Sequence, residues 1–249
     1  MTRVLVWNEN CHEKQSPHIA ALYPDGIHGA LASHLRTVPG LDVQTATQDE
    51  PERGLSADRL SQTDVVIYWG HIAQNEIPDE IVDRLQRHIL EGLGLIILHS
   101  ACISKIACRM LGTTGMMKWR ESGEHQRHWT VAPGHPIAEG VPEHFEIAQD
   151  ETYGEHFDIP APDELIFIGW SPGGEVLRSG TCFTRGQGRI FLFTPGHETY
   201  PVYHDQNVLK IIANATKWAA KTRNPEPLRG NVQPLEPLPL PSPKGGAEL

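Results

Sequence analysis

Short apolar runs alternate with amphipathic segments along the first half of the chain. Residues 3–7, 65–69 and 93–98 are apolar almost throughout and have the length of strands buried on both faces, and residues 42–47 form a shorter candidate strand. Between these runs, apolar side chains recur at helical spacing over residues 27–38, 78–90 and 103–111. The alternation predicts an α/β fold, with a flavodoxin-like, doubly wound and mainly parallel sheet.

The second half of the chain interrupts this pattern and then completes it. Residues 112–180 are richer in Pro, Gly and polar residues and hold short strand-like runs at 128–132, 145–148, 165–170 and 175–178. We interpret them as an insertion that extends the same sheet with antiparallel strands. Apolar runs at 181–184 and 189–194 resume the sheet, and an amphipathic helix over 206–221 closes a single domain of residues 1–222.

The composition changes abruptly in residues 223–249. Proline recurs from Pro225 to Pro243, and glycine stands at positions 230, 245 and 246. This composition cannot build a core and predicts an extended arm or tail. A loose terminus and an arm lying across a neighbouring subunit of a homo-oligomer both fit the pattern.

The charge balance narrows the classes of partner. The chain has 31 acidic and 21 basic residues and a formal net charge of -10, which disfavours nucleic acids and anionic membranes as main partners and fits a small neutral molecule. No apolar segment approaches the ~20 residues that span a bilayer, and the N-terminus lacks a signal-peptide pattern, so we expect a cytoplasmic protein. The four cysteines lack a C-x-x-C pair and are expected to be reduced thiols.

The fourteen histidines fall into two classes by their position. We interpret one class as ordinary surface or core residues: His12, His18, His34, His88, His125, His128, His135 and His144. The other class lies at predicted loop or element ends: His28, His71, His99, His156, His197 and His204. Right-handed crossovers bring the carboxyl ends of parallel strands to one edge of the sheet, which is the ligand crevice of such folds.

Histidines gathered with a carboxylate suggest two kinds of chemistry. His28, His71, His197 and Glu151 have the nitrogen and oxygen donors that a zinc-type divalent ion takes. The same groups can instead transfer protons to and from a hydroxyl or ketone. Because the sequence contains no H-x-x-x-H or H-E-x-x-H spacing, both hypotheses stay open. The chain also lacks G-x-G-x-x-G and G-x-x-x-x-G-K-[ST] motifs, so we expect no nucleotide cofactor.

Further residues are candidates for the wall of the crevice. The acidic segment 150–156 contains interleaved aromatic residues, which favours Glu151 and His156 as pocket residues rather than a solvated face. Asn8, Trp69, Tyr153 and Glu198 are the other candidates for substrate binding. The rings of Trp7, Trp69, Trp119 and Tyr153 can serve either as sugar-stacking faces or as core.

Cys102 is the candidate nucleophile for covalent catalysis. It follows a predicted strand end and lies near a helix start, where the pKa of a thiol can fall. The sequence around it, His99 to Ile103, lacks the flanking glycines of a sharp nucleophile elbow, and Ser100 meets the same objection. A buried filler role therefore competes with the nucleophile role.

Several blocks of sequence resemble one family. They are Trp7-Asn8-Glu9, Gly26-Ile27-His28, Trp69-Gly70-His71, Leu98-His99-Ser100, Lys118-Trp119-Arg120, Glu151 with Tyr153-Gly154-Glu155, Gly174-Glu175-Val176, Arg178-Ser179-Gly180 and Pro195-Gly196-His197-Glu198-Thr199-Tyr200-Pro201. Together they resemble the trehalose utilisation protein A (ThuA-like) family over most of the chain, up to about residue 237.

This resemblance implies a class I glutamine amidotransferase-like fold without amidotransferase chemistry. It also implies a role on trehalose-like disaccharides or 3-keto sugars, alongside sugar-oxidising dehydrogenases. One position departs from the family pattern, because Cys102 stands where a histidine is expected.

The resulting hypothesis is an enzyme of carbohydrate metabolism of the lyase, isomerase or hydrolase type. His28, His71, His197 and Glu151 carry the chemistry, and His156 and Cys102 lie nearby. Two alternatives remain at this stage: an amidotransferase-like thiol enzyme that uses Cys102, and a non-catalytic sugar-binding or regulatory domain.

Overall fold

Nine strands form one mixed sheet in the part of the chain that the structure, a computed structural model, describes, namely residues 1–221 and 233–239. The strands are β1 (Thr2–Asn8), β2 (Leu41–Thr47), β3 (Val65–Trp69), β4 (Gly94–Leu98), β5 (Lys118–Thr130), β6 (His144–Gly154), β7 (Glu164–Trp170), β8 (Val176–Arg185) and β9 (Gly188–Phe193). Their order is β2-β1-β3-β4-β9-β8-β7-β5-β6. The first five strands in this order are parallel and the last four pairings are antiparallel, which confirms the predicted fold class.

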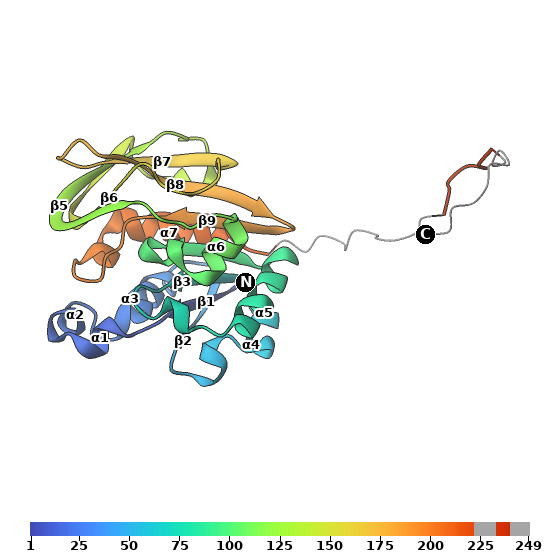
Figure 1. Cartoon of the computed structure of the whole chain (residues 1–249), viewed down its shortest axis with the longest axis horizontal. Helices are drawn as coiled ribbons and strands as arrows, with labels where there is room; N and C mark the ends of the chain where they lie inside the picture. Colours follow the sequence, from blue (N-terminus) through green and yellow to red (C-terminus); the bar gives the residue numbers. More distant parts are fainter. Residues whose placement is uncertain (222–232, 240–249) are drawn as a thin grey trace.

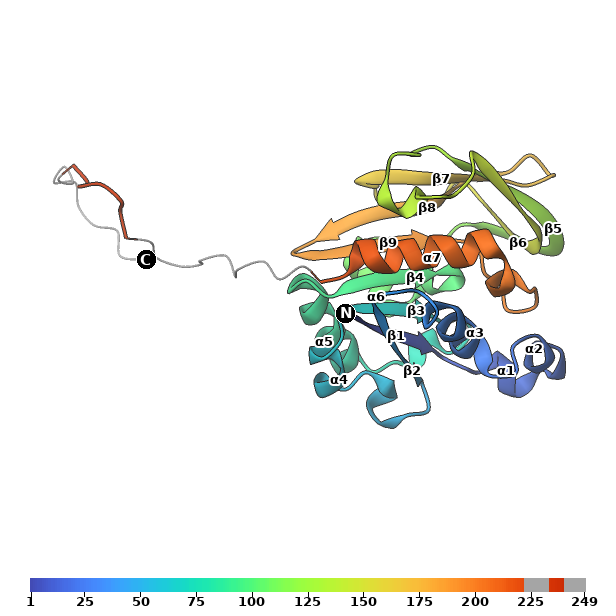
Figure 2. The same ribbon diagram turned by 180° about the vertical axis from the view of Figure 1, so that it is seen from behind.

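Helices cover both faces of the parallel part of the sheet (Figures 1 and 2). One face packs on α3 (Gly26–Leu35) and α7 (Gln206–Ala219), and the other packs on α4 (Ala57–Ser61), α5 (Asp79–Leu90) and α6 (Lys105–Leu111). Alternate residues of β3 divide between the two cores, with Val65 and Ile67 in the first and Val66 and Tyr68 in the second. Burial on both faces explains why these strands are apolar throughout.

The antiparallel strands β5 to β8 correspond to the predicted insertion. Their boundaries differ from the prediction: β5 begins before the predicted run 128–132 and β6 continues beyond the run 145–148. The runs at 175–178 and 181–184 belong to the single strand β8. The glycine that separates the runs, Gly180, lies within that strand and packs against Phe167. Figure 1 shows β5, β6 and β7 folding back over the β9 end of the sheet, so that the outer strand β6 approaches the parallel strands' carboxyl edge.

The parallel strands end in register. Asn8 of β1 pairs with Trp69 of β3, Trp69 with Leu98 of β4, and Leu98 with Phe193 of β9. The residues that follow each strand therefore enter the same edge of the sheet, as right-handed crossovers require. This edge is where the predicted crevice residues come together.

The connection from β1 to α3 is more ordered than a polar loop. It contains two short helices, α1 (His12–Gln15) and α2 (Pro17–Leu22). The side chain of Ser16 caps α2 by accepting a hydrogen bond from the Ile19 N–H, and Pro17 follows at the first helical position. Such short helices lack the length for a clear periodic pattern, so the sequence could not indicate them.

The predicted arm of residues 223–249 lies outside the described residues, apart from 233–239. The choice between a tail and an oligomer arm therefore stays a prediction. Among the described helices, none combines the length and the apolar character that crossing a membrane needs.

Candidate functional site

A cavity of about 200 Å³ opens at the carboxyl edge of the parallel strands. Its wall comes from the ends of β3 and β4, from the start of β5, from β6 and from the loop after β9: His71, Ser100, Cys102, Ile103, Met116, Met117, Trp119, Glu121, Glu151, Tyr153 and His197. The predicted residues His71, His197 and Glu151 thus face one cavity. The rings of His71 and His197 are 5.4 Å apart, and His197 Nε2 is 3.9 Å from Glu151 Oε2.

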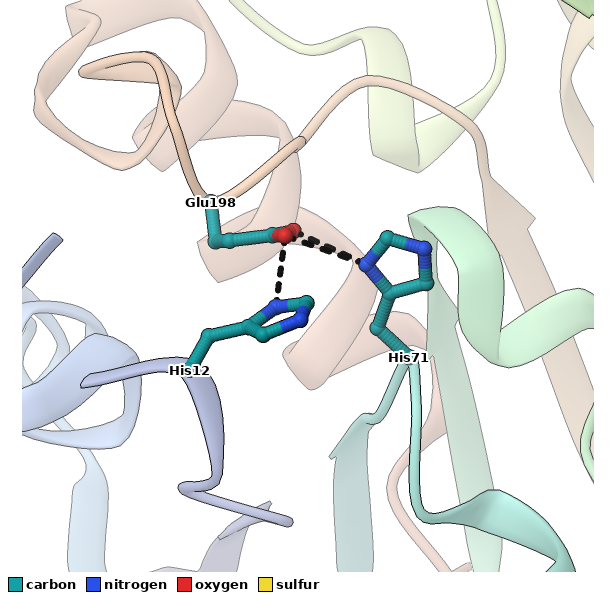
Figure 3. A group of neighbouring side chains, drawn as sticks. All are labelled: His12, His71 and Glu198. Carbon is teal, nitrogen blue, oxygen red and sulfur yellow. Dashed lines mark hydrogen bonds and ion pairs between the residues drawn. The ribbon is translucent and has the colours of Figure 1, made fainter. Parts of the chain in front are cut away.

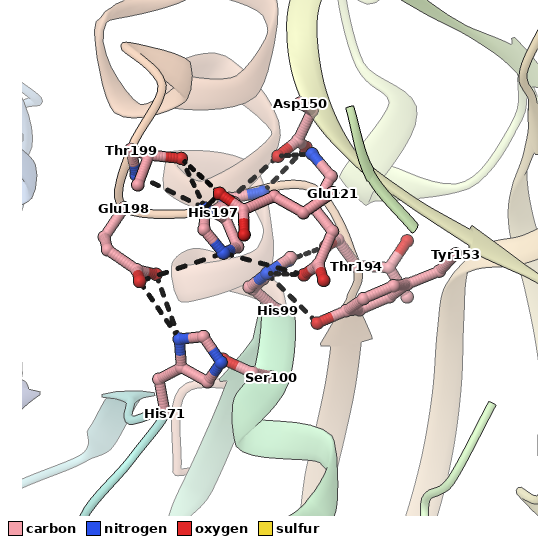
Figure 4. Close-up of polar contacts among 12 residues, drawn as sticks. His71, His99, Ser100, Glu121, Asp150, Tyr153, Thr194, His197, Glu198 and Thr199 are labelled. Atoms are coloured by element: carbon pink, nitrogen blue, oxygen red, sulfur yellow. Dashed lines mark hydrogen bonds and ion pairs between the residues drawn. The ribbon is translucent and has the colours of Figure 1, made fainter. Parts of the chain in front are cut away.

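Three of the buried groups at this edge form what we call the inner group: His99, Glu151 and His197. Figure 4 shows the two histidines of this group with their polar neighbours. His99 Nε2 lies 3.1 Å from Glu151 Oε2 and 3.0 Å from Tyr153 Oη. Its Nδ1 donates to the Thr194 carbonyl at 2.7 Å, since a carbonyl can only accept. His99 is therefore held at both ring nitrogens. It has φ of 51°, a rare backbone conformation for a residue with a side chain, at the turn that ends β4.

The two histidines of the inner group differ in protonation. Burial lowers the pKa of His99, but the hydrogen bond to Glu151 and the charges of Asp150 and Glu151 outweigh burial, so the pKa is raised. Burial and the nearby charge of His99 lower the pKa of His197 to about 4. His99 Nδ1 donates to the Thr194 carbonyl and its Nε2 faces the Glu151 carboxylate, so both ring nitrogens have the acceptor partners of an imidazolium. The lowered pKa of His197 leaves that imidazole neutral at neutral pH.

The tautomer of His197 follows from its neighbours. The Thr199 N–H donates to His197 Nδ1 at 3.3 Å, and Thr199 Oγ1 lies 2.7 Å from the same nitrogen. Because Nδ1 accepts, the proton of the neutral ring is on Nε2. That N–H faces Glu151 and Glu198, whose nearest oxygens are 3.9 and 3.8 Å away.

A second cluster, the outer group, consists of His12, His71 and Glu198 (Figure 3). Glu198 Oε1 lies 2.5 Å from His12 Nδ1, and both carboxylate oxygens lie 3.1 Å from His71 Nδ1. Burial raises the pKa of Glu198, but the contacts with His12 and His71 outweigh burial and hold it far below its usual range. Glu198 is therefore a fully charged carboxylate behind the cavity wall.

Two buried carboxylates hold the loops that carry these groups. Asp150 accepts hydrogen bonds from the backbone N–H groups of Glu151, Gly196 and His197 at 2.9 to 3.0 Å, and burial raises its pKa to about 6. Glu9 accepts from the backbone N–H groups of Ile72 and Ala73. These bonds tie β6 to the loop after β9, and β1 to the loop that carries His71.

Other predicted site residues lie away from the cavity. His28 Nδ1 is 3.0 Å from Asn8 Nδ2, which also donates to Glu13, and none of the three lines the cavity. His28 therefore does not join His71, His197 and Glu151, and the predicted four-ligand metal set is not assembled. Asn8 is fully buried in this network rather than open to a substrate.

The aromatic candidates separate by burial. Trp69 is core, with its Nε1–H donating to the Gly196 carbonyl, and Trp7 stacks on Tyr68. Trp119, in contrast, is 64% exposed and lines the cavity with Tyr153. Trp119 and Tyr153 are therefore the rings that a substrate in the cavity can contact.

Cys102 lies at the cavity but in a state unsuited to a nucleophile, and His156 lies outside the cavity wall. Cys102 lines the cavity but is buried, its Sγ donates to the Gly115 carbonyl, and burial raises the pKa of its thiol far above its usual range. Such a thiol is largely protonated and is better suited to packing in the core than to attack on a substrate. His156 is exposed and is not part of the cavity wall.

The sequence interpretation missed one member of each group. His12 was assigned to the ordinary histidines but lies against Glu198, and His99 was placed at the edge without a role. The signal for His99 was its position directly after a buried strand. His12 had no comparable signal. It begins α1 in the connection after β1, and the sequence did not predict the course of that connection.

Comparisons with known proteins agree with this architecture. A family model described as trehalose utilisation (ThuA) matches residues 3–219. A protein from Parabacteroides merdae ATCC 43184, described as ThuA-like, has a similar structure with a TM-score of 0.63 and 18% identity, over 91% of this chain and 93% of that one. A ThuA-like protein from Bacteroides uniformis ATCC 8492 gives 0.60 and 14%, over 88% and 91%.

A cytoplasmic protein from Salmonella typhimurium LT2 is similar as well, with a TM-score of 0.60 and 13% identity over 88% of this chain and all of that one. A search among curated proteins finds no match. Sequence identities of 13 to 18% show a shared fold and nothing more. The family model, in contrast, matches residues 3–219 and shows the family. The chain belongs to the trehalose utilisation (ThuA) family.

Proposed function

We propose that this protein is a cytoplasmic enzyme of carbohydrate use that transfers protons on a small sugar, as a lyase or isomerase acting on a trehalose-like disaccharide or a 3-keto sugar. The family description supports the sugar class. The name of the Salmonella relative supports the location. The cavity, about 200 Å³, has room for one ring of such a disaccharide, so the second ring would lie outside it, near the exposed Trp119.

One observation carries the proposal: His99 and His197, with ring centroids 5.4 Å apart around Glu151, have pKa values displaced in opposite directions. When the environments of neighbouring titratable groups move their pKa values apart, the groups take different roles in acid–base chemistry. Structural ion pairs also shift pKa values, but here Glu151 and His197 both line a cavity.

The roles follow from the geometry. Glu151, charged at neutral pH, accepts the proton that leaves the sugar, and His99 stabilises the carboxylate through its 3.1 Å contact. The neutral His197 directs Nε2–H into the site and donates a hydrogen bond to the sugar oxygen on which negative charge develops. Trp119 offers an exposed ring at the mouth for the apolar face of the sugar.

Deuterium exchange tests this function and does not require the product to be identified. The protein is incubated in D2O with 3-keto-trehalose, whose ring C–H groups next to the ketone are acidic, and the loss of their signal is followed by proton NMR. Trehalose, which has no ketone and no such C–H group, is the negative control. We expect exchange catalysed by the wild type and slowed about 1,000-fold in Glu151→Gln, within the range that a general base contributes. Glu146→Gln, on the same strand but exposed and paired with Arg127, should match the wild type.

The remaining outcomes separate the alternative functions. Sugar binding by the wild type with neither exchange nor product identifies a binding domain and contradicts the enzyme. Exchange that survives Glu151→Gln but is lost in Cys102→Ala would favour the thiol mechanism, against the burial of that thiol.

A further inference from the structure

We propose that the outer group, His12, His71 and Glu198, binds one zinc-type divalent cation at the edge of the cavity. This inference concerns the crevice of the proposed enzyme but does not depend on the proton-transfer reaction. It replaces the metal set expected from the sequence, because His28 lies elsewhere and His12 takes part.

The three donors come from separate segments that the fold brings together. His12 begins α1, His71 follows β3 and Glu198 lies between β9 and α7. Figure 3 shows both imidazoles directed at the one carboxylate. Two histidines and a glutamate are the donor set of catalytic rather than structural zinc sites, since three protein ligands leave a position for water or substrate.

The contact distances are close to those of metal ligands. Ligand atoms around a tetrahedral zinc ion, with bonds near 2.0–2.1 Å, lie about 3.3 Å from one another. His71 Nδ1 is already 3.1 Å from the Glu198 oxygens, and His12 Nδ1 is 2.5 Å from Oε1. A shift of His12 by less than ~1 Å would make room for the ion.

An unpartnered atom points to a missing cation. His12 Nδ1 is buried and has no aligned hydrogen bond among the described residues, although it is 2.5 Å from Glu198 Oε1. At this separation a positive charge must lie between the nitrogen and the carboxylate oxygen, either a proton on Nδ1 or a metal ion. A shared metal ion satisfies both atoms at once.

The charge around His12 also favours a cation. Glu9, Glu13 and Glu198 all act on His12, all three are buried, and in the described ranges none of them pairs with a lysine or arginine. Glu13 Oε2 is likewise buried without a hydrogen-bond partner. N–H groups bond Glu9 and Glu13, but no lysine or arginine of the described residues balances their charges, and a divalent ion would reduce the cost of burying them.

The inner group is a poorer metal site despite a similar composition. His99 Nε2 already contacts both Glu151 and Tyr153. His197 carries its proton on Nε2, because Nδ1 accepts from Thr199, so no lone pair faces Glu151. The inner group therefore suits proton transfer, and the ion in the outer group would supply Lewis-acid polarisation of a substrate oxygen beside it.

Zinc titration of the chelator-treated full chain, by isothermal calorimetry at pH 7, tests the site. We expect one Zn²⁺ per chain, and binding weakened about 100-fold or more in His12→Gln and in Glu198→Gln, since second-shell changes alone cost 10- to 100-fold. Two controls should match the wild type: His144→Ala, an exposed histidine on β6, and Cys11→Ser, the thiol next to His12. Mg²⁺, which prefers oxygen ligands, should not compete.

The outcomes are decisive in each direction. Failure of the wild type to bind Zn²⁺, equal binding in His12→Gln, or loss of binding in His99→Gln with retention in His12→Gln would overturn the proposal. Circular dichroism and melting of each variant distinguish a lost ligand from a lost fold, and Glu198→Gln preserves shape if His12→Gln does not fold. Deuterium exchange that persists without zinc would leave the proposed function intact. The zinc titration by itself decides whether the outer group is a metal site.

Discussion

Neighbouring charges decide whether the effect of burial on the pKa of a single residue prevails in this protein, as Glu151 and His128 illustrate. Burial raises the pKa of Glu151, but the contacts with His99 outweigh it and keep the carboxylate charged. His128 is as buried as His99 but has only neutral partners, Ser179 Oγ and Gln126 Oε1, both at 3.0 Å. Its pKa falls to about 3 because burial acts without a compensating charge. Two buried histidines thus differ because of their neighbours.

His128 makes a prediction about acid stability. Its pKa is lower in the folded than in the unfolded chain, so its contribution is complete above pH ~6.5 and is lost as the pH falls from ~6.5 toward about 3. The loss approaches ~1.4 kcal/mol per pH unit over that window. In His128→Gln, the free energy of unfolding should fall less steeply with acid than in the wild type.

Urea denaturation at several pH values checks this prediction. The two proteins are compared by how steeply the free energy of unfolding changes with pH. The absolute free energies are not compared, because the variant also loses hydrogen bonds. Equal slopes in the two proteins would contradict the prediction, because they would show that His128 takes up its proton as readily in the folded chain as in the unfolded chain.

Cys102 provides a second prediction at this scale. Its thiol is buried and its pKa is raised, so iodoacetamide should label it far more slowly than a model peptide in the native protein. Peptide mass spectrometry reports the labelled positions. Cys102→Ala should keep activity and lose about 1 kcal/mol of stability. Rapid labelling accompanied by loss of activity would instead make Cys102 the nucleophile.

At the scale of elements, the turn after β9 positions both groups at once. The turn runs from Pro195 to Glu198, and Asp150 of β6 binds its backbone through the N–H groups of Gly196 and His197. Gly196 has φ of 139°, and a Cβ at this position would lie 2.0 Å from Tyr203 Oη. Only glycine fits, so the Pro-Gly-His-Glu order that stood out in the sequence is a requirement of the backbone.

Gly196→Ala should therefore disturb both groups. We expect a loss on the order of 3 kcal/mol, from backbone strain together with overpacking against Tyr203. Thermal melting measures the stability, and zinc titration reports the position of Glu198. Gly134→Ala, where an added Cβ meets nothing within 4 Å, is the matched control. Gly196→Ala/Tyr203→Phe should recover part of the loss, because it removes the nearest clashing atom, Oη, but leaves Cζ at 2.5 Å and the backbone strain.

At the scale of the whole molecule, the site combines two halves of the sheet. The parallel half supplies His71, His99 and His197 from strand ends, and the antiparallel extension supplies Glu151 and Tyr153 from β6. In the sheet order, β6 is four strands away from β9, yet Asp150 bonds the turn after β9. The extension must curve over the edge to make this contact, as Figure 1 shows.

The sequence predicted the parts that follow from periodicity and strand topology. Apolar runs placed β1, β3, β4 and β9, and parallel order placed the histidines after them on one edge. The path of long connections has no such rule, so the sequence missed His12, which α1 turns inward, and misjudged His28. Burial of single side chains also escaped prediction: Trp69 proved to be core, whereas Trp119 lines the cavity.

The central claim is that His99 and His197 hold opposite protonation states around Glu151. Nitrogen-15 NMR titration of the histidine rings in the metal-free protein tests it most directly, with assignments from His99→Gln and His197→Gln. At pH 7 the account predicts an imidazolium at His99 and a neutral ring at His197 with its proton on Nε2, which stays neutral down to about pH 4. The same charge state on both rings at pH 7, or titration of His197 near ~6.5, would contradict it.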